Sequence, residues 1–152
     1  KLDMMKAYER VEGPYLRAIL LNLGVKARWG DIVMNLVGSV QFSVMFNGKK
    51  LEEFKPSRGI RQGDPISPYL FLIAAEGLSC LLKSRGESSN LRGVHVAAMA
   101  PPVNHLLFAD DSLLFFKENV VGSTEVNQVL DVYCQASGQR INYNKSSIFF
   151  SK

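Results

Sequence analysis

Two adjacent acidic residues stand inside a run that is otherwise almost entirely apolar. Asp110 and Asp111 lie between the apolar residues 106–109 and 113–116. Burying unpaired carboxylates is very unfavourable, so we expect a tight turn at the edge of a sheet. Neighbouring side chains on a strand point to opposite faces, so the two acids share a site only at such a turn. The pair would attract a hard cation, Mg²⁺ or Mn²⁺, although Asp-Asp is also common in solvated turns.

A third carboxylate comes from the start of the chain. Asp3 would join the pair if its strand lay beside the Asp110–Asp111 hairpin. Two divalent ions bridged by carboxylates can activate a hydroxyl group and stabilise a leaving pyrophosphate. Phosphoryl transfer needs mainly positioning and charge neutralisation, so few residues suffice. Because Asp3 lies 107 positions before Asp110, spacing alone does not establish the site.

Periodicity predicts the elements that would position these acids. Helices are expected over residues 14–24, 29–38 and 65–84, with Asp64 as N-cap, and from Ser123 or Thr124 to the residue before Gly138. Strands are expected at 40–46 and 51–54 around a type I′ turn at Asn47-Gly48, at 94–99, on both sides of the acidic pair, and in a final hairpin of 141–143 and 148–150. Helices mixed with hairpins favour an α+β fold over a parallel α/β sheet.

The composition is that of one ordinary globular domain. With 152 residues, 47% hydrophobic and 21% charged, the chain can bury a core and is not a disordered tail. It has no apolar run of about 18 residues and no signal-peptide pattern. Cys80 and Cys134 are expected to be reduced core residues of an intracellular protein, nuclear or cytoplasmic and not secreted. The net charge of +4 tolerates a polyanion partner, and loops are expected at 84–93 and 101–102.

Four segments, in order, resemble the palm motifs of reverse transcriptases. Residues 1–11 are similar to the first motif and residues 58–71 to the second. Residues 108–111, Phe-Ala-Asp-Asp, resemble the paired-aspartate motif, and residues 137–146 the helix-to-strand motif after it. The Arg-Gln-Gly-Asp-Pro and Phe-Ala-Asp-Asp versions resemble LINE-type (non-LTR) retrotransposons, especially those of plant genomes.

The resemblance implies a polymerase palm over residues 1–152, an antiparallel sheet packed on helices without its fingers and thumb. The implied activity is RNA-directed DNA polymerisation with two Mg²⁺ or Mn²⁺ ions. Asp3, Asp110 and Asp111 would be the metal-binding catalytic carboxylates. Tyr8 would lie under the incoming sugar and exclude a 2′-hydroxyl, where the alternative is a core aromatic residue.

The same resemblance assigns further contacts. Gln62 and Gly63 would contact the incoming nucleotide and the template, where the alternative is an ordinary loop before a helix. Lys145 would lie near the triphosphate, or would be a solvated lysine. Arg58 and Arg61 are candidate phosphate contacts, with surface salt bridges as the alternative.

Some residues depart from the family pattern or carry no metal-ligand pattern. Glu9 stands where the family more often has Asp, and Met5 replaces a small residue. Phe108 is expected to pack rather than to stack on a primer base. His95 and His105 are interpreted as structural or surface residues.

The family places its fingers before Asp3, and its thumb and usually an endonuclease domain also lie outside this segment, so this chain, which begins at Lys1, is interpreted as part of a longer polypeptide. Its expected partners are an RNA template, a DNA primer, a dNTP and the missing fingers and thumb, with no membrane. One alternative is an inert retrotransposon remnant, or a palm kept for binding nucleic acid or protein. Another is an RNA-templated RNA polymerase or a group II intron-like enzyme. Exposed apolar patches and marginal stability are expected.

Overall fold

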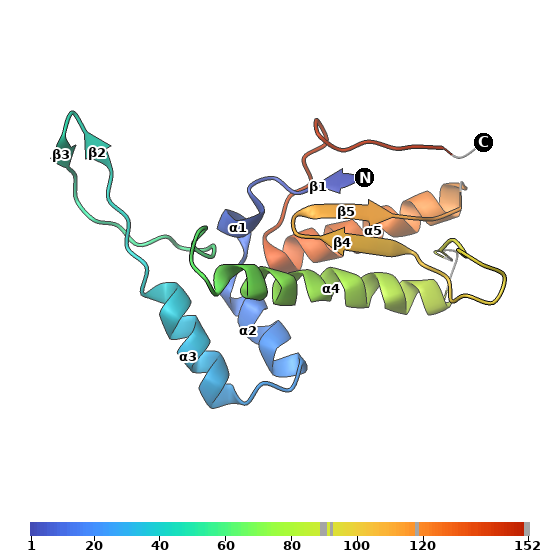
Figure 1. Cartoon of the computed structure of the whole chain (residues 1–152), viewed down its shortest axis with the longest axis horizontal. Helices are drawn as coiled ribbons and strands as arrows, with labels where there is room; N and C mark the ends of the chain where they lie inside the picture. The colour runs from blue at the N-terminus through green and yellow to red at the C-terminus, as the bar shows by residue number, and fades with distance from the viewer. Residues whose placement is uncertain (89–90, 92, 118, 151–152) are drawn as a thin grey trace.

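Three short strands form the antiparallel sheet that carries the acidic residues. A computed structural model describes residues 1–88, 91, 93–117 and 119–150. The strands β1 (Leu2–Asp3), β4 (His105–Phe108) and β5 (Asp111–Leu114) are arranged in the order β1-β5-β4. Figure 1 shows α4 (Ser67–Ser88) running along the β4–β5 hairpin, with α5 (Val120–Ser137) behind it. Small antiparallel sheets packed against helices confirm the predicted α+β class.

The core lies where α2 (Gly13–Asn22), α4 and α5 pack together. Pro14 stands in the first turn of α2, where its missing N–H costs no helical hydrogen bond. Buried apolar side chains recur every three or four residues along α4 and α5, as expected for helices with one packed face. They are Leu70, Phe71, Ala74, Ala75, Leu78 and Leu82 on α4, and Val126, Val129, Leu130 and Tyr133 on α5.

A helix packed against α2 leads to a small hairpin that projects from this body (Figure 1). The helix α3 (Ala27–Gly38) leads to β2 (Met45–Phe46) and β3 (Lys49–Lys50). Asn47 and Gly48 both have positive φ, 48° and 75°, which confirms the type I′ turn. Both strands are shorter than predicted, and all of their residues are exposed. One further bridge joins Phe42 to Phe54.

Helix α4 begins later than the sequence indicates. Asp64 does not cap a helix starting at Pro65, and the helix starts at Ser67 instead. The Asp64 carboxylate accepts a hydrogen bond from the Ile66 backbone N–H at 3.3 Å, and its carbonyl accepts one from Ser67 N–H. Asp64 therefore closes a local turn that leads into the helix.

Helix α5 begins earlier than the sequence indicates. Its N-cap is Asn119, whose side chain accepts a hydrogen bond from Gly122 N–H at 2.6 Å. The prediction of a start at Ser123 or Thr124 was wrong because Asn119 supplies the cap three residues upstream of Gly122. The predicted end is confirmed, since Gly138 adopts φ 78° at the C-cap.

Two expectations for the segment between α4 and β4 need correction. Residues 94–99 were expected to form a strand, but Val94 makes a single isolated bridge to Val103 and Met99 is 98% exposed. Part of the loop expected at 84–93 is helical, because α4 continues to Ser88. Residues 89, 90 and 92 of that loop lie outside the described residues.

Much apolar surface is exposed, as the sequence predicted. The projecting hairpin and the chain's last described residues contribute a large part of it, including Phe46, Phe54, Ile148 and Phe149. The cysteines are free, but Cys80 is exposed and Cys134 is half-buried, so the prediction of two core cysteines was wrong. Within the described ranges, no helix has the length and apolar character needed to cross a membrane.

Candidate functional site

The acidic pair lies at the turn between β4 and β5. Phe108 pairs with Asp111 across the hairpin, which leaves Ala109 and Asp110 as its two turn residues. Ala109 has φ 51°, a left-handed conformation that side chains other than glycine rarely adopt. Asp110 is exposed in the turn, and Asp111 is half-buried as the first residue of β5. Phe108 is 84% exposed, so the expectation that it packs was wrong.

Strand β1 lies beside this hairpin and brings Asp3 to it. In the antiparallel pairing of β1 with β5, Leu2 lies opposite Ser112 and Asp3 lies opposite Asp111. Side chains of directly opposed residues emerge on the same face of a sheet. The three carboxylates expected to act together therefore come from one small region of the sheet.

Residues that follow α5 hold β1 from its other side. The Asp3 carbonyl accepts a hydrogen bond from Asn142 N–H at 2.8 Å, and Asp3 N–H donates to the Ser146 hydroxyl at 3.1 Å. Met4 forms an antiparallel bridge with Ile141. The predicted final hairpin of residues 141–143 and 148–150 was wrong, because Ile141 pairs with the start of the chain instead.

A pocket of about 370 Å³ opens beside Asp3 and Asp110. Five of the nine candidate site residues line it, and all nine lie in the described part of the chain. The lining residues are Asp3, Met4, Met5, Lys6, Ala7, Tyr8, Glu9, Gln62, Asp110, Asn142 and Lys145. Lys6 and Asn142 line the pocket but were not predicted as site residues. The only signal for either residue was its place in a motif-like segment, residues 1–11 for Lys6 and residues 137–146 for Asn142.

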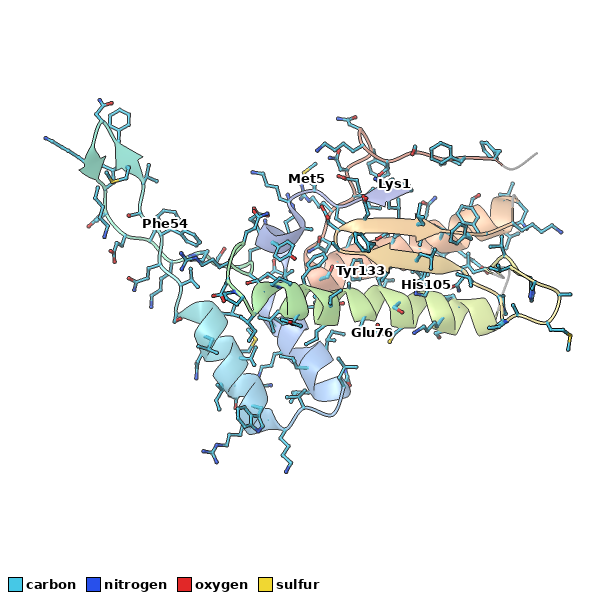
Figure 2. The ribbon with its side chains drawn as sticks, viewed as in Figure 1. Lys1, Met5, Phe54, Glu76, His105 and Tyr133 are labelled. Atoms are coloured by element: carbon cyan, nitrogen blue, oxygen red, sulfur yellow. The ribbon has the colours of Figure 1, made fainter. Side chains whose placement is uncertain are left out.

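Asp111 is not among the lining residues, and its carboxylate pairs with Lys1. The Lys1 ammonium lies 2.9 Å from Asp111 Oδ1, and Figure 2 shows Lys1 beside the sheet. This hydrogen bond and the charge of Asp111 raise the pKa of Lys1, with smaller contributions from Asp3 and Asp110. Across the described residues, no three His, Cys, Asp or Glu side chains are grouped to hold a metal ion.

Three further candidates lie outside the pocket lining. Arg58 pairs with Glu12 at 3.2 Å, and both side chains are substantially exposed, so this pair is a surface salt bridge. Arg61 is exposed. Gly63 has φ 90° and open space where a Cβ would stand, which leaves its backbone accessible.

Tyr8 belongs to the four-residue helix α1 (Ala7–Arg10), which forms one wall of the pocket. Its ring stacks on Phe71 of α4, with centroids 4.8 Å apart and an interplanar angle of 14°. Its carbonyl accepts a hydrogen bond from Ile60 N–H at 2.9 Å. Gly59 permits this approach, because a Cβ there would stand 2.7 Å from the Glu9 carbonyl oxygen.

A separate polar cluster joins α4 to β4 on another part of the hairpin. His105 Nε2 lies 3.0 Å from the Ser79 hydroxyl, and His105 Nδ1 lies 2.6 Å from Asn104 Oδ1. Figure 2 shows His105 between β4 and α4. Burial lowers the pKa of His105, the Lys83 charge lowers it further, and Glu76 acts in the opposite direction. These contacts agree with the structural role predicted for this histidine.

Comparison with known proteins identifies the family. A family model described as reverse transcriptase (RNA-dependent DNA polymerase) matches residues 1–152, so the chain belongs to the reverse transcriptase family. It is homologous to the polyproteins of non-LTR retrotransposons, which confirms the resemblance in its motifs.

Three relatives illustrate this homology. A transposon TX1 protein of Xenopus laevis is 30% identical over 96% of this chain, and the polyprotein of the retrotransposable element R2DM of Drosophila melanogaster is 28% identical over 95%. An uncharacterized mitochondrial protein of Arabidopsis thaliana is 47% identical over 49% of this chain. The matches span 11%, 13% and 63% of those relatives, respectively.

Proposed function

We propose that this chain is a polymerase palm that adds deoxynucleotides to a DNA primer on an RNA template. One observation carries the proposal: Asp3 and Asp110, 107 positions apart, line a single pocket together with Tyr8, Gln62 and Lys145. The pocket combines groups that suit a nucleoside triphosphate and its counter-ions. They are carboxylates for the cations, an ammonium for the phosphates, and an aromatic ring and an amide for the nucleoside.

The donor set fits a hard divalent cation. Carboxylate oxygens are the ligands that Mg²⁺ and Mn²⁺ prefer, and Asp3 and Asp110 supply them in the pocket. Asp111 is proposed as the third ligand. Its carboxylate already contacts a positive charge in this structure, the Lys1 ammonium. When bound, two such ions would favour the deprotonated primer hydroxyl and neutralise charge on the departing pyrophosphate.

The remaining pocket residues would bind and orient the nucleotide. The Tyr8 ring, held against Phe71, would pack under the sugar and leave no room for a 2′-hydroxyl. Lys145 would neutralise triphosphate charge, and Gln62 would contact the nucleotide. Gly63, with its accessible backbone, would approach the template or the nucleotide.

Nucleic acid would meet the pocket from the exposed side of the loop before α4. Arg58 and Arg61 would contact phosphates there, with Arg58 exchanging its surface pair with Glu12 for a phosphate oxygen. We propose that fingers and thumb are supplied by further polypeptide, as the much greater length of the TX1 and R2DM relatives suggests.

Primer extension tests the proposal. The purified 152-residue chain is given a DNA primer on an RNA template with Mg²⁺ and dNTPs, beside Asp110→Asn and a control, Asp131→Asn, which changes an exposed aspartate on α5. Extension lost in Asp110→Asn and kept in Asp131→Asn supports the proposal. Equal extension by all three chains contradicts the role of Asp110. Template binding without extension would favour a binding module, and preferred use of rNTPs would favour an RNA polymerase.

A further inference from the structure

A glutamine outside the pocket is buried in a way that glutamines rarely are. Gln139 follows the Gly138 cap of α5 and is 2% exposed. Its Nε2 donates a hydrogen bond of 2.7 Å to the carbonyl oxygen of Ala7, 132 positions away. Its Oε1 is buried without a hydrogen-bond partner among the described residues. An apolar side chain of similar size would fill this space without leaving a buried oxygen unpaired. The feature that distinguishes the glutamine here is the N–H group that it donates to Ala7.

The carbonyl that Gln139 binds belongs to the helix that carries Tyr8. A helix of four residues leaves most of its carbonyl groups without helical partners. In α1, Gln139 supplies a donor for the Ala7 carbonyl and Ile60 N–H supplies one for the Tyr8 carbonyl. Together with the stacked ring of Phe71, these contacts fix both the backbone and the ring plane of Tyr8.

Gln139 is itself held rigidly enough to act as a fixed support. Its backbone N–H donates to the buried Ser137 hydroxyl at 3.2 Å, and the Ser137 carbonyl accepts from Glu12 N–H at 2.9 Å. A Cβ at Gly138 would stand 2.5 Å from the Arg10 carbonyl oxygen, so the segment lies directly against the end of α1.

We infer that Gln139 is a positioning residue that sets the place of Tyr8 in the pocket and, through it, the discrimination between deoxyribonucleotides and ribonucleotides. The second half of this inference rests on the proposed function. The first half concerns only the geometry of the chain, so the two are tested by separate measurements.

The test compares Gln139→Met with the unsubstituted chain. Methionine keeps nearly the same volume and removes the donor to Ala7. The matched control is Gln135→Met, which changes an exposed glutamine on α5. Chains with labelled tyrosine are examined by NMR, because the Tyr8 ring resonances depend on stacking against Phe71 and are assigned with Tyr8→Phe. Calorimetric titrations with dCTP and CTP, which differ only in the 2′-hydroxyl, are made in Mg²⁺.

We expect Gln139→Met to shift the Tyr8 ring resonances and to reduce the preference for dCTP over CTP about fivefold, the size expected for one lost hydrogen bond. Gln135→Met leaves both unchanged. Tyr8 resonances unchanged in a folded Gln139→Met chain would overturn the inference, even if its melting temperature fell. If Gln139→Met does not fold, Gln139→Asn withdraws the amide by one carbon and gives the same two outcomes.

The two proposals fail in different ways. If the unsubstituted chain binds neither dCTP nor CTP, the proposed function fails while the NMR comparison still decides whether Gln139 positions Tyr8. If the unsubstituted chain prefers dCTP and Gln139→Met keeps that preference in full, the inference fails and the proposed function stands.

Discussion

Asp3 lies directly opposite Asp111 across the antiparallel pairing of β1 and β5. Like charges that face each other on a sheet are destabilising, and the Lys1 ammonium on Asp111 offsets part of that cost. The sheet therefore gathers negative charge at the place where Asp110 enters the pocket. If the proposed cation binds there, we expect this arrangement to be more stable with the cation than without it.

The first prediction concerns the stability of Asp3→Asn with and without a divalent ion. In EDTA the variant should be at least as stable as the unsubstituted chain, because one of two facing carboxylates has been neutralised. Addition of Mg²⁺ at about ten times its dissociation constant should raise the melting temperature of the unsubstituted chain by roughly 3 °C, and that of the variant by less. Differential scanning fluorimetry measures both, with KCl at equal ionic strength as control. An equal rise in the two chains would contradict the assignment of Asp3.

The second prediction concerns the strained turn at Ala109. A left-handed alanine costs about 1–2 kcal/mol, and part of that cost returns as glycine's greater entropy in the unfolded state. Ala109→Gly should therefore raise the free energy of unfolding by about 0.5–1 kcal/mol in urea titrations. Ala136→Gly, at an exposed position of α5, should lower it by about the same amount. A loss of stability in Ala109→Gly would show that the turn is not strained.

The sequence predicts those parts of the fold whose signals are local. Asn47-Gly48 indicates a type I′ turn by its residue types alone, and the acidic pair marks a turn because its neighbours are apolar. The helices were predicted from apolar residues that recur every three or four positions, a pattern that requires only one packed face of the helix. Residues 40–46 alternate as a strand should, but they pair continuously only at Met45 and Phe46 beside the turn, with one isolated bridge from Phe42 to Phe54. Continuous pairing is favoured where a surface covers one face of the strands.

The parts of the site that depend on distant partners could not be predicted from spacing. Leu2–Asp3 is too short to show a strand period, so its place beside β5 required the fold. Residues 141–143 were expected to form part of a local hairpin. Instead, Asn142 N–H donates a hydrogen bond to the Asp3 carbonyl, which joins a late segment of the sequence to an early one. The motifs nevertheless named five residues that line the pocket, because family resemblance carries long-range information that periodicity lacks.

The third prediction separates backbone strain from close approach at Gly59. Gly59 and Gly24 both have positive φ, 95° and 86°, so alanine costs about 1–2 kcal/mol at each. Only at Gly59 would the new Cβ meet backbone, that of Glu9, whereas nothing lies within 4 Å at Gly24. Gly59→Ala should therefore lose at least about 1 kcal/mol more than Gly24→Ala in chemical denaturation. Equal losses would mean that α1 moves freely away from the loop, which would also weaken its role as a fixed wall of the pocket.

The last prediction concerns the pH dependence that His105 gives to stability. Burial between α4 and β4 lowers its pKa, so the unfolded chain binds a proton more readily than the folded chain. The neutral imidazole, bonded to Ser79 and Asn104, therefore contributes stability above pH about 6.5 that is lost as the pH falls through the lowered pKa.

We expect the free energy of unfolding to decrease less between pH 7.5 and pH 5 in His105→Gln than in the unsubstituted chain. His95→Gln, which changes an exposed imidazole, is the matched control. Urea titrations at each pH measure the free energy of unfolding. Parallel curves for His105→Gln and the unsubstituted chain would show that His105 is not the source of the pH dependence.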